Sequence, residues 1–184
     1  MDDLTTYLGG MLHLLKVIPE TILDGDGIRY SIYLAGCRHA CPGCHNPLSW
    51  SPQAGEPLTE ELVDRLIEEI KGNFLLDGVT FSGGDPFYNP TDFGPLLRRV
   101  REETGLSIWC YTGYLYEELL ADPERAPLLE WIDVLVDGPF EKRLYDPTLS
   151  FRGSSNQRII HLKETVARRR SAALLSESGL GHVH

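Results

Sequence analysis

Two patterns of hydrophobic and polar positions alternate along the chain, one typical of strands and one typical of helices. Short apolar runs rich in Ile, Val, Leu and Tyr, which favour strands, are followed by segments whose apolar residues recur every three or four positions, as on the buried face of a helix. The predicted strands are His13–Ile18, Ile28–Ala35, Val79–Ser82, Leu106–Tyr111, Ile132–Val136 and Gln157–Leu162. Strands that alternate with helices in this way indicate parallel βαβ construction.

The helices are predicted from their apolar faces and from the residues that begin and end them. The predicted helices are Thr59–Lys71, Asp92–Thr104, Leu115–Leu120 and Lys163 to about Leu175. Thr59 is a suitable N-cap, and Gly72 and Gly105 are expected to end the first two helices. About five β/α units are too few for a complete eight-stranded barrel. We therefore expect an α/β fold, a partial (β/α) barrel of about five to six parallel strands with helices outside.

The composition is that of an ordinary globular protein, with 42% hydrophobic and 24% charged residues in 184. There is no internal repeat and no linker of domain size. We expect one domain over residues 1–175, followed by a flexible C-terminal tail over residues 176–184, where Ser, Gly and His dominate.

The charge and the length of the apolar runs exclude several classes of protein. A net charge of -10 disfavours a nucleic-acid partner, because nucleic-acid affinity rests on clustered Lys and Arg. The basic run Arg168–Arg170 is predicted to be a solvated helix face. No apolar run approaches the roughly 20 residues of a membrane span, and the acidic N-terminus is unlike a signal peptide. These features predict a cytoplasmic protein without a membrane partner.

Three of the four cysteines lie within the eight-residue run Cys37–Cys44, which directly follows a predicted strand. Stable disulfides are rare in the cytosol, so crowded cysteines there indicate metal or redox chemistry. Three thiolates on one loop can bind three irons of a 4Fe-4S cluster and leave the fourth iron open for substrate. Cys37, Cys41 and Cys44 are therefore the predicted ligands, whereas Cys110 is predicted to be a small buried hydrophobe.

The alternative for these cysteines is a structural zinc site completed by His45. Zinc ligands usually come in two separated pairs that join distant segments, and all four residues here would lie on one loop. This arrangement makes the zinc site the weaker hypothesis.

A second signal is the turn Ser82-Gly83-Gly84-Asp85-Pro86, which also follows a predicted strand. Adjacent glycines let a ligand approach the backbone closely, and exposed peptide groups can bind a charged amine or carboxylate. A Gly-Gly turn by itself is more often structural, so its interpretation depends on the cysteine loop.

Taken together, the two signals are far more specific than either one. The spacing Cys37-x3-Cys41-x2-Cys44 followed by Gly83-Gly84-Asp85 resembles the radical S-adenosylmethionine superfamily, and the resemblance covers most of the chain. Within it, Asp24–Arg29 and Cys44–Pro47 are similar to the activating enzymes of glycyl radical enzymes. More narrowly, the chain resembles the branch that activates anaerobic ribonucleoside-triphosphate reductase, in the segments Trp109–Tyr114, Val134–Gly138 and Arg152–Gln157.

The resemblance implies that the open iron chelates the amino and carboxylate groups of S-adenosylmethionine. It implies that Ser82, Gly83 and Gly84, with Asp85, form the turn that holds the methionine amino group. The segment Gly43–His45, which includes Cys44, would then lie along the nucleoside.

The chemistry implied by the resemblance is reductive cleavage of S-adenosylmethionine to methionine and a 5'-deoxyadenosyl radical. The electron would come from a reduced flavodoxin-like donor. The radical would remove a hydrogen from a glycine of the partner, the catalytic subunit of the anaerobic reductase. The cofactor performs the difficult chemistry, and the protein positions and shields it.

Two residues depart from the wider superfamily. Gly43 stands where an aromatic residue often precedes the third cysteine, so the adenine contact must come from elsewhere. Asp85 stands where Glu is usual, which leaves the role of its side chain open. Both variants resemble the reductase-activating branch.

Several other residues are candidates with an ordinary structural alternative. Asp137, which ends an apolar strand, could bind ribose hydroxyls or a cation, or it could simply make a turn. The polar stretch Arg152–Asn156, with Ser154 and Ser155, could contact the carboxylate of S-adenosylmethionine or the protein partner. Arg29, one strand before the cysteine loop, could tune the potential of the cluster or pair with Asp24 or Asp26, and an ordinary surface ion pair is the favoured prediction.

The remaining candidates are aromatic. Of Tyr111, Tyr114 and Tyr116, two are predicted to be core or rim residues. His39 and His45 lie inside the cysteine loop, and His45 is predicted to pack beside the nucleoside in preference to binding iron.

Three other functions remain as alternatives. The chain could activate pyruvate formate-lyase or another glycyl radical enzyme. It could also act on a small molecule, as in deazapurine biosynthesis, with turnover in the absence of a protein partner. A zinc-stabilised binding module would hold zinc and would not cleave S-adenosylmethionine.

Overall fold

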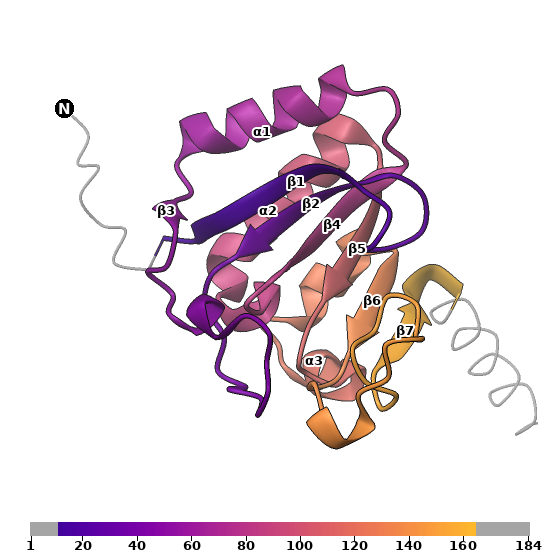
Figure 1. Ribbon diagram of the computed structural model, residues 1–184. Helices are drawn as coiled ribbons and strands as arrows, with labels where there is room; N and C mark the ends of the chain where they lie inside the picture. The colour runs from indigo at the N-terminus through magenta and orange to yellow at the C-terminus, as the bar shows by residue number, and fades with distance from the viewer. Residues whose placement is uncertain (1–10, 165–184) are drawn as a thin grey trace, which may run out of the picture.

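A sheet of seven strands runs through residues 11–164, the part of the chain that the computed structural model describes (Figure 1). The strand order across the sheet is β3-β1-β2-β4-β5-β6-β7. The strands are β1 (His13–Thr21), β2 (Arg29–Leu34), β3 (Glu56–Pro57), β4 (Gly78–Gly83), β5 (Ser107–Tyr111), β6 (Val134–Asp137) and β7 (Arg158–His161). All six predicted strands are present, and the two-residue β3 is an addition.

The number of parallel strands is smaller than predicted. Strands β2, β4, β5 and β6 are mutually parallel, but β1 pairs antiparallel with β2, and β7 pairs antiparallel with β6. Among the described residues four strands pair in parallel, so the expectation of five to six is wrong. The two-residue β3 runs in the same direction as these four but pairs only with the antiparallel β1. Parallel pairing needs a crossover of a dozen or more residues, usually helical. The β1–β2 connection, residues 22–28, is too short for one, and the β6–β7 connection contains only a three-residue 3₁₀ helix.

Helix α1 (Glu60–Gly72) begins and ends where the sequence predicts. The Thr59 hydroxyl accepts a hydrogen bond from the N–H of Leu62, which satisfies one of the free donors of the first turn. The apolar positions of α1 lie on one face, and five of them are buried: Leu62, Val63, Leu66, Ile67 and Ile70.

Helices α2 (Pro90–Thr104) and α3 (Tyr116–Ala121) also agree with the prediction. Asn89 caps α2 through its side chain, and Gly105 ends α2 in a left-handed conformation with φ of 67°. Four 3₁₀ helices complete the connections: Pro47–Trp50, Pro86–Tyr88, Ala126–Trp131 and Lys142–Leu144. The predicted helix from Lys163 to Leu175 lies almost entirely outside the described residues, as do the predicted tail 176–184 and the first ten residues.

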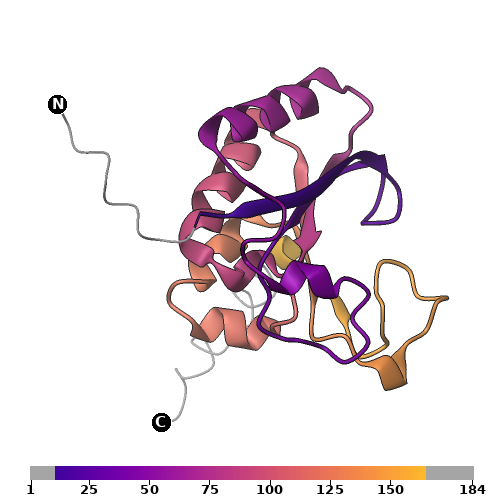
Figure 2. The same ribbon diagram turned by 60° about the vertical axis from the view of Figure 1, so that its left-hand side comes forward.

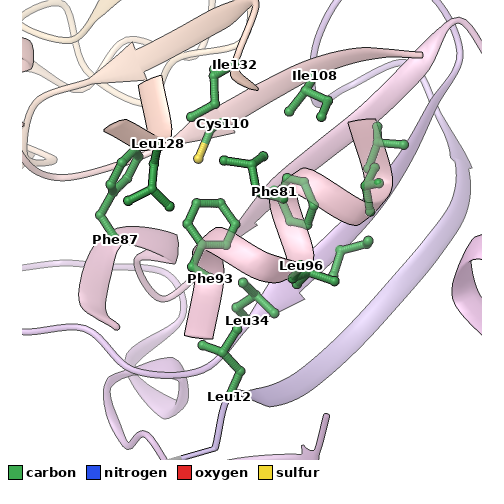
Figure 3. Close-up of a cluster of buried hydrophobic side chains, with 14 of the residues drawn as sticks. Leu12, Leu34, Phe81, Phe87, Phe93, Leu96, Ile108, Cys110, Leu128 and Ile132 are labelled. Carbon is green, nitrogen blue, oxygen red and sulfur yellow. The ribbon is translucent and has the colours of Figure 1, made fainter. Parts of the chain in front are cut away.

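The helices pack on one face of the sheet and bury the main hydrophobic core (Figure 2). Alternate residues of β2 and β4 point into this core, among them Ile32, Leu34 and Phe81. Figure 3 shows Phe81 and Phe93 together in this core, and their rings lie 5.2 Å apart in an edge-to-face arrangement. Cys110 points into the same cluster and is 0% exposed, which confirms the prediction of a buried hydrophobe.

The other face of the sheet carries polar and aromatic residues and has no covering helix among the described residues. Figure 2 shows the long loop after β6, in orange, on this side of the sheet. A smaller cluster formed by Trp109, Val134 and Val136 packs here against Phe151. In residues 11–164 no helix is both long enough and apolar enough to span a bilayer.

Candidate functional site

An open cavity of about 1140 Å³ lies on the polar face, at the carboxyl ends of the parallel strands. Ligands of open α/β sheets characteristically bind at this edge, outside the carboxyl ends of the strands. The cavity takes side chains from three parallel strands and from the cysteine loop: Tyr33, Ser82, Gly83, Tyr111, Cys44 and His45. A second hollow, of about 620 Å³, lies between α2 and the 3₁₀ helix Ala126–Trp131 and contains no predicted site residue.

The cysteine loop, residues 35–46, is joined at its start by backbone hydrogen bonds to the 3₁₀ helix that follows it. The N–H of Gly36 donates to the carbonyl of Ser49 (2.8 Å), and the N–H of Cys37 donates to the carbonyl of Trp50 (3.2 Å). Both acceptors belong to the 3₁₀ helix that follows the loop. These bonds bring the two ends of the loop together. The three cysteines therefore lie on one short loop beside the end of β2.

The cysteines Cys37, Cys41 and Cys44 are partly exposed and carry free thiols. Cys44 lines the cavity, and its sulfur accepts a hydrogen bond from the N–H of Asn46 (3.4 Å). Within residues 11–164, no three His, Cys, Asp or Glu side chains converge on a single metal ion. A 4Fe-4S cluster instead takes each thiolate at a separate iron, so three accessible thiols on one loop fit its donor set.

The sulfur of Cys37 has the most distinctive surroundings of the three. Burial raises the pKa of the Cys37 thiol, and hydrogen bonds from the backbone N–H groups of His39 and Ala40 partly oppose this rise. Ala40 adopts a left-handed conformation with φ of 45°, which is uncommon for a residue other than glycine. The backbone after Cys37 therefore turns back to present its N–H groups to the thiol.

The glycines of the second predicted motif allow close contact between the two loops. Gly83 has φ of 107°, and a Cβ there would lie 2.4 Å from the carbonyl oxygen of Leu34. A Cβ on Gly84 would lie 2.5 Å from the carbonyl oxygen of Gly36. The N–H of Gly84 donates to Leu34 and that of Asp85 to Gly36, so these donors hold the cysteine loop. A ligand at this turn would be bound through carbonyl groups, which suits an ammonium group.

Asp85 does not line the cavity, and its side chain is 2% exposed. Its carboxylate accepts hydrogen bonds from Nε2 of His39 (2.7 Å), the Thr112 hydroxyl (3.0 Å) and the N–H of Gly113 (3.0 Å). The N–H of Phe87 is a further donor (3.0 Å). The side chain of Asp85 thus joins the cysteine loop to the loop after β5.

Gly43 has φ of 82°, and its missing side chain leaves room for a neighbour. A Cβ at Gly43 would lie 2.9 Å from Cδ of Lys142, which comes from the loop after β6. In the same region the ring of Phe140 lies edge-to-face with His45, with 5.6 Å between centroids. Lys142 therefore fills the space that a side chain at residue 43 would need, and Phe140 places an aromatic ring beside His45.

Asp137 is 0% exposed and is bonded on both carboxylate oxygens. It accepts hydrogen bonds from the N–H of Tyr116 (2.8 Å) and from two nitrogens of Arg158, which also pairs with Glu117. These bonds tie the end of β6 to α3 and β7. Asp137 does not line the cavity, so its contact with ribose or a cation stays a prediction.

The polar stretch after residue 151 closes over the cavity, where Arg152 and Gly153 line the wall. Nη1 of Arg152 donates to the carbonyl of Gln157 (3.0 Å), but its buried Nε has no partner among the described residues. The buried Oδ1 of Asn156 also has none. Ser154 is buried and accepts from the N–H of Glu141, whereas Ser155 is exposed.

The structure corrects the prediction for Arg29. The expected surface ion pair with Asp24 or Asp26 is wrong, because Arg29 is 1% exposed and donates to Thr80, Ser107 and the carbonyl of Val79. Burial lowers the pKa of Arg29 to about 10, partly offset by nearby acidic residues such as Asp133. Alternation along β2 turns this side chain to the polar face, where it joins β2, β4 and β5.

The three tyrosines lie in different surroundings, and two of them pack in the core or at its rim, as predicted. Tyr111 lines the cavity, Tyr116 is buried in the core, and Tyr114 packs edge-to-face on His39 with 4.6 Å between ring centroids.

Sequence reasoning missed one pair in the cavity wall, in which the Tyr33 hydroxyl donates to Asp24 (2.5 Å). The polar residues Arg29, Ser31 and Tyr33 alternate along β2, and this period of two could have identified the cavity face.

Known proteins match this chain over most of its length. Residues 23–160 match the family model described as a 4Fe-4S single cluster domain. The chain is 40% identical over 149 residues to the anaerobic ribonucleoside-triphosphate reductase-activating protein of Escherichia coli K12, covering 79% of this chain and 96% of the relative. The protein of that name in Pasteurella multocida is 38% identical over 150 residues, covering 79% and 95%. In Enterobacteria phage T4 the corresponding protein is 32% identical over 147 residues, covering 78% and 90%.

Proposed function

Because the chain belongs to the family of anaerobic ribonucleoside-triphosphate reductase-activating proteins, we propose that it activates such a reductase by radical S-adenosylmethionine chemistry. The cluster would supply the electron for reductive cleavage of S-adenosylmethionine to methionine and a 5'-deoxyadenosyl radical, which would take a hydrogen atom from a glycine of the reductase and become 5'-deoxyadenosine. The observation that carries the proposal is a loop of three free cysteines at the rim of a cavity on the carboxyl edge of the sheet.

The residues of this chain divide into those that hold the cluster and those that hold S-adenosylmethionine. Cys37, Cys41 and Cys44 would bind three irons and leave the fourth open. The carbonyl groups of the turn Ser82–Gly84 would accept hydrogen bonds from the methionine ammonium, because the N–H of Gly84 is bonded to Leu34 at the end of β2 and that of Asp85 to Gly36 of the cysteine loop.

The nucleoside end would lie along Gly43, Cys44 and His45, of which the last two line the cavity. Phe140 is in contact with His45 and supplies an aromatic ring that Gly43 lacks. Arg152, whose Nε is a buried donor without a partner in the described chain, would bind the methionine carboxylate. A buried N–H without an acceptor is costly, so a ligand oxygen at this atom is favourable.

Access for the partner is provided by the open side of the cavity. Its rim carries exposed apolar side chains, namely Ile22, Leu23, Leu48 and Tyr145, which are 56–80% exposed. Exposed apolar groups that gather at a site often mark a protein contact. We propose that the glycine-bearing segment of the reductase enters here, that a reduced flavodoxin-like protein donates the electron, and that the reaction takes place in the cytoplasm.

The sheet would then be the partial barrel of the radical S-adenosylmethionine superfamily, reduced to four parallel strands with antiparallel strands on both sides. Its helix-covered face carries the hydrophobic core, and its polar face carries the cavity. This division suits radical chemistry, which needs a shielded site with controlled access.

The proposal is tested with the full chain under anaerobic conditions. Iron and sulfide are reconstituted, dithionite and S-adenosylmethionine are added, and 5'-deoxyadenosine is measured for the wild type and for Cys41→Ala. We expect cleavage by the wild type alone. Addition of the reductase should then give the electron paramagnetic resonance signal of a glycyl radical.

The alternatives predict different results in the same experiment. Radical formation on pyruvate formate-lyase in place of the reductase would favour the other activase, and steady turnover of a small molecule would favour an enzyme without a protein partner. A colourless protein that retains zinc, binds no iron and forms no 5'-deoxyadenosine would overturn the proposal.

A further inference from the structure

The buried carboxylate of Asp85 is bonded to His39, which lies inside the cysteine loop between Cys37 and Cys41. An ionised carboxylate only accepts hydrogen bonds, so Nε2 of His39 carries the hydrogen in this pair. The other donors to Asp85 come from Phe87 and from the loop after β5, so the carboxylate is fixed from two sides. Asp85 is therefore a rigid anchor for His39.

The imidazole ring of His39 is confined by its neighbours as well as by this hydrogen bond. Tyr114 packs edge-to-face on it, and a Cβ on Gly113 would lie 2.4 Å from its Cδ2. Only glycine at residue 113 leaves room for the ring. The side-chain exposure of His39 is 18%, so the ring is largely enclosed.

The backbone attached to this ring faces the sulfur of Cys37. The N–H groups of His39 and Ala40, two and three residues after Cys37, act as backbone donors that lower the pKa of its thiol. Ala40 is in a left-handed conformation, which persists only where the surrounding structure imposes it. The fixed His39 ring is the neighbouring element that can impose it.

We propose that Asp85 and His39 are positioning residues that hold the His39 and Ala40 N–H groups on the Cys37 sulfur and thereby raise the reduction potential of the cluster. The inference rests on the proposed function, because it takes Cys37 as a cluster ligand. Hydrogen bonds to the sulfurs are among the factors that set the potential of iron-sulfur clusters. Donors stabilise the reduced cluster more than the oxidised one, because the reduced cluster carries one more negative charge.

The test compares His39→Leu, which removes the donor, with His39→Gln, whose amide nitrogen can replace Nε2. Each reconstituted chain is titrated anaerobically without S-adenosylmethionine or reductase, and the reduced cluster is measured by electron paramagnetic resonance. We expect His39→Leu to lower the ratio of reduced to oxidised cluster at the wild-type midpoint by about three- to tenfold. This change equals about 30–60 mV for a one-electron couple. His39→Gln should stay within about twofold of the wild type.

Asp133→Asn is the matched control, because Asp133 is also a hydrogen-bonded carboxylate but lies beside the first residues of β5, at the opposite edge of the sheet. It should lower stability and leave the potential unchanged. If His39→Leu binds no iron while His39→Gln binds it normally, the positioning role is also supported.

Equal potentials in His39→Leu and the wild type would overturn the inference, as would equal shifts in His39→Leu, His39→Gln and Asp133→Asn. A wild-type chain that holds no cluster would overturn the proposed function itself. The two failures are therefore distinguishable.

Discussion

At the scale of single residues, the site depends on glycines that lack a Cβ and on a buried donor that lacks an acceptor. Gly84 brings the glycine turn against the cysteine loop, and Gly43 leaves room for Lys142. The Nε of Arg152 is a buried donor without a partner in the described chain. The glycines mark places where a neighbouring part of the chain packs closely. The unpaired donor marks a place where a ligand oxygen can bind.

Gly84→Ala should lower the free energy of unfolding by about 1–3 kcal/mol, the usual cost of overpacking. Its Cβ would meet backbone carbonyl oxygens of Gly36 and Ser49 at 2.5 and 2.8 Å, and neither is the end of a flexible side chain. Urea unfolding of the apo chain measures the change. Gly72→Ala is the control, because a Cβ there has nothing within 4 Å and should leave stability equal or up to about 1 kcal/mol higher. Equal stability of Gly84→Ala and the wild type would contradict the contact.

Arg152→Gln should weaken the binding of S-adenosylmethionine about 10- to 100-fold, because it removes a charge-assisted hydrogen bond worth about 1.5–3 kcal/mol. Equilibrium dialysis against the reconstituted, oxidised protein measures the affinity without turnover. Arg143→Gln is the control, because the Arg143 side chain is 91% exposed. Identical affinities for Arg152→Gln and Arg143→Gln would exclude the carboxylate contact.

At the scale of elements, a strand such as β2 presents apolar side chains to the core on one face of the sheet and polar side chains to the cavity on the other. Ile32 and Leu34 of β2 enter the core, while Arg29 and Tyr33 turn to the cavity face. The start of β5 is fixed by Asp133, which accepts from the N–H of Ile108 and from Arg101 at the end of α2. This carboxylate fixes α2 relative to the sheet, away from the cysteine loop.

Asp133→Asn should lower the free energy of unfolding at pH 7 by about 1–3 kcal/mol. Burial raises the pKa of Asp133, but hydrogen bonds from Lys163, Ile108 and Arg101 outweigh it, so the pKa lies below its ordinary value. A carboxyl whose folded pKa is lowered stabilises the fold above its unfolded pKa of about 3.9 and loses this contribution as the pH falls.

The difference between wild type and Asp133→Asn should therefore shrink between about pH 5 and pH 3. Urea unfolding at several pH values measures it, with the exposed Asp64→Asn as the control that changes stability by less than about 1 kcal/mol. A difference that stays constant across this range would show that Asp133 acts by packing alone.

At the scale of the whole molecule, the core and the site lie on opposite faces of one sheet. Figure 2 shows the helices on one face and the long loop after β6 on the other. The helices α1 and α2 cover one face, and the loops that carry the cysteines and Arg152 surround the cavity on the other. The fold consequently has a hydrophobic core that does not include the proposed cluster ligands Cys37, Cys41 and Cys44, unlike a small zinc module whose metal replaces a core.

Cys41→Ser should leave the unfolding free energy of the apo chain within about 1 kcal/mol of the wild type, because Cys41 is partly exposed and outside the core. Phe81→Ala, on the other face, should lower it by about 3–5 kcal/mol, because Phe81 is fully buried. Chemical denaturation of the two variants under reducing, metal-free conditions tests this contrast. An apo wild type without a cooperative transition would indicate that metal holds the fold.

The sequence by itself determined the main elements, and it predicted which cysteines bind the cluster. Apolar periodicity located α1, α2 and six of the seven strands, because each element buries one face. The spacing of Cys37, Cys41 and Cys44 indicated a cluster because ligand chemistry depends on residue type and short spacing, and both can be read along the chain.

Tertiary structure decided the direction of β1 and β7 and the roles of the charged residues. Pairing direction depends on where a connection crosses the sheet, and apolar alternation is the same for both directions. Arg29 and Asp137 were ambiguous because burial and partners come from distant segments, such as Ser107 for Arg29 and Arg158 for Asp137. Asp85 shows the same principle, since its bond to His39 joins residues 46 positions apart that only the folded sheet brings together.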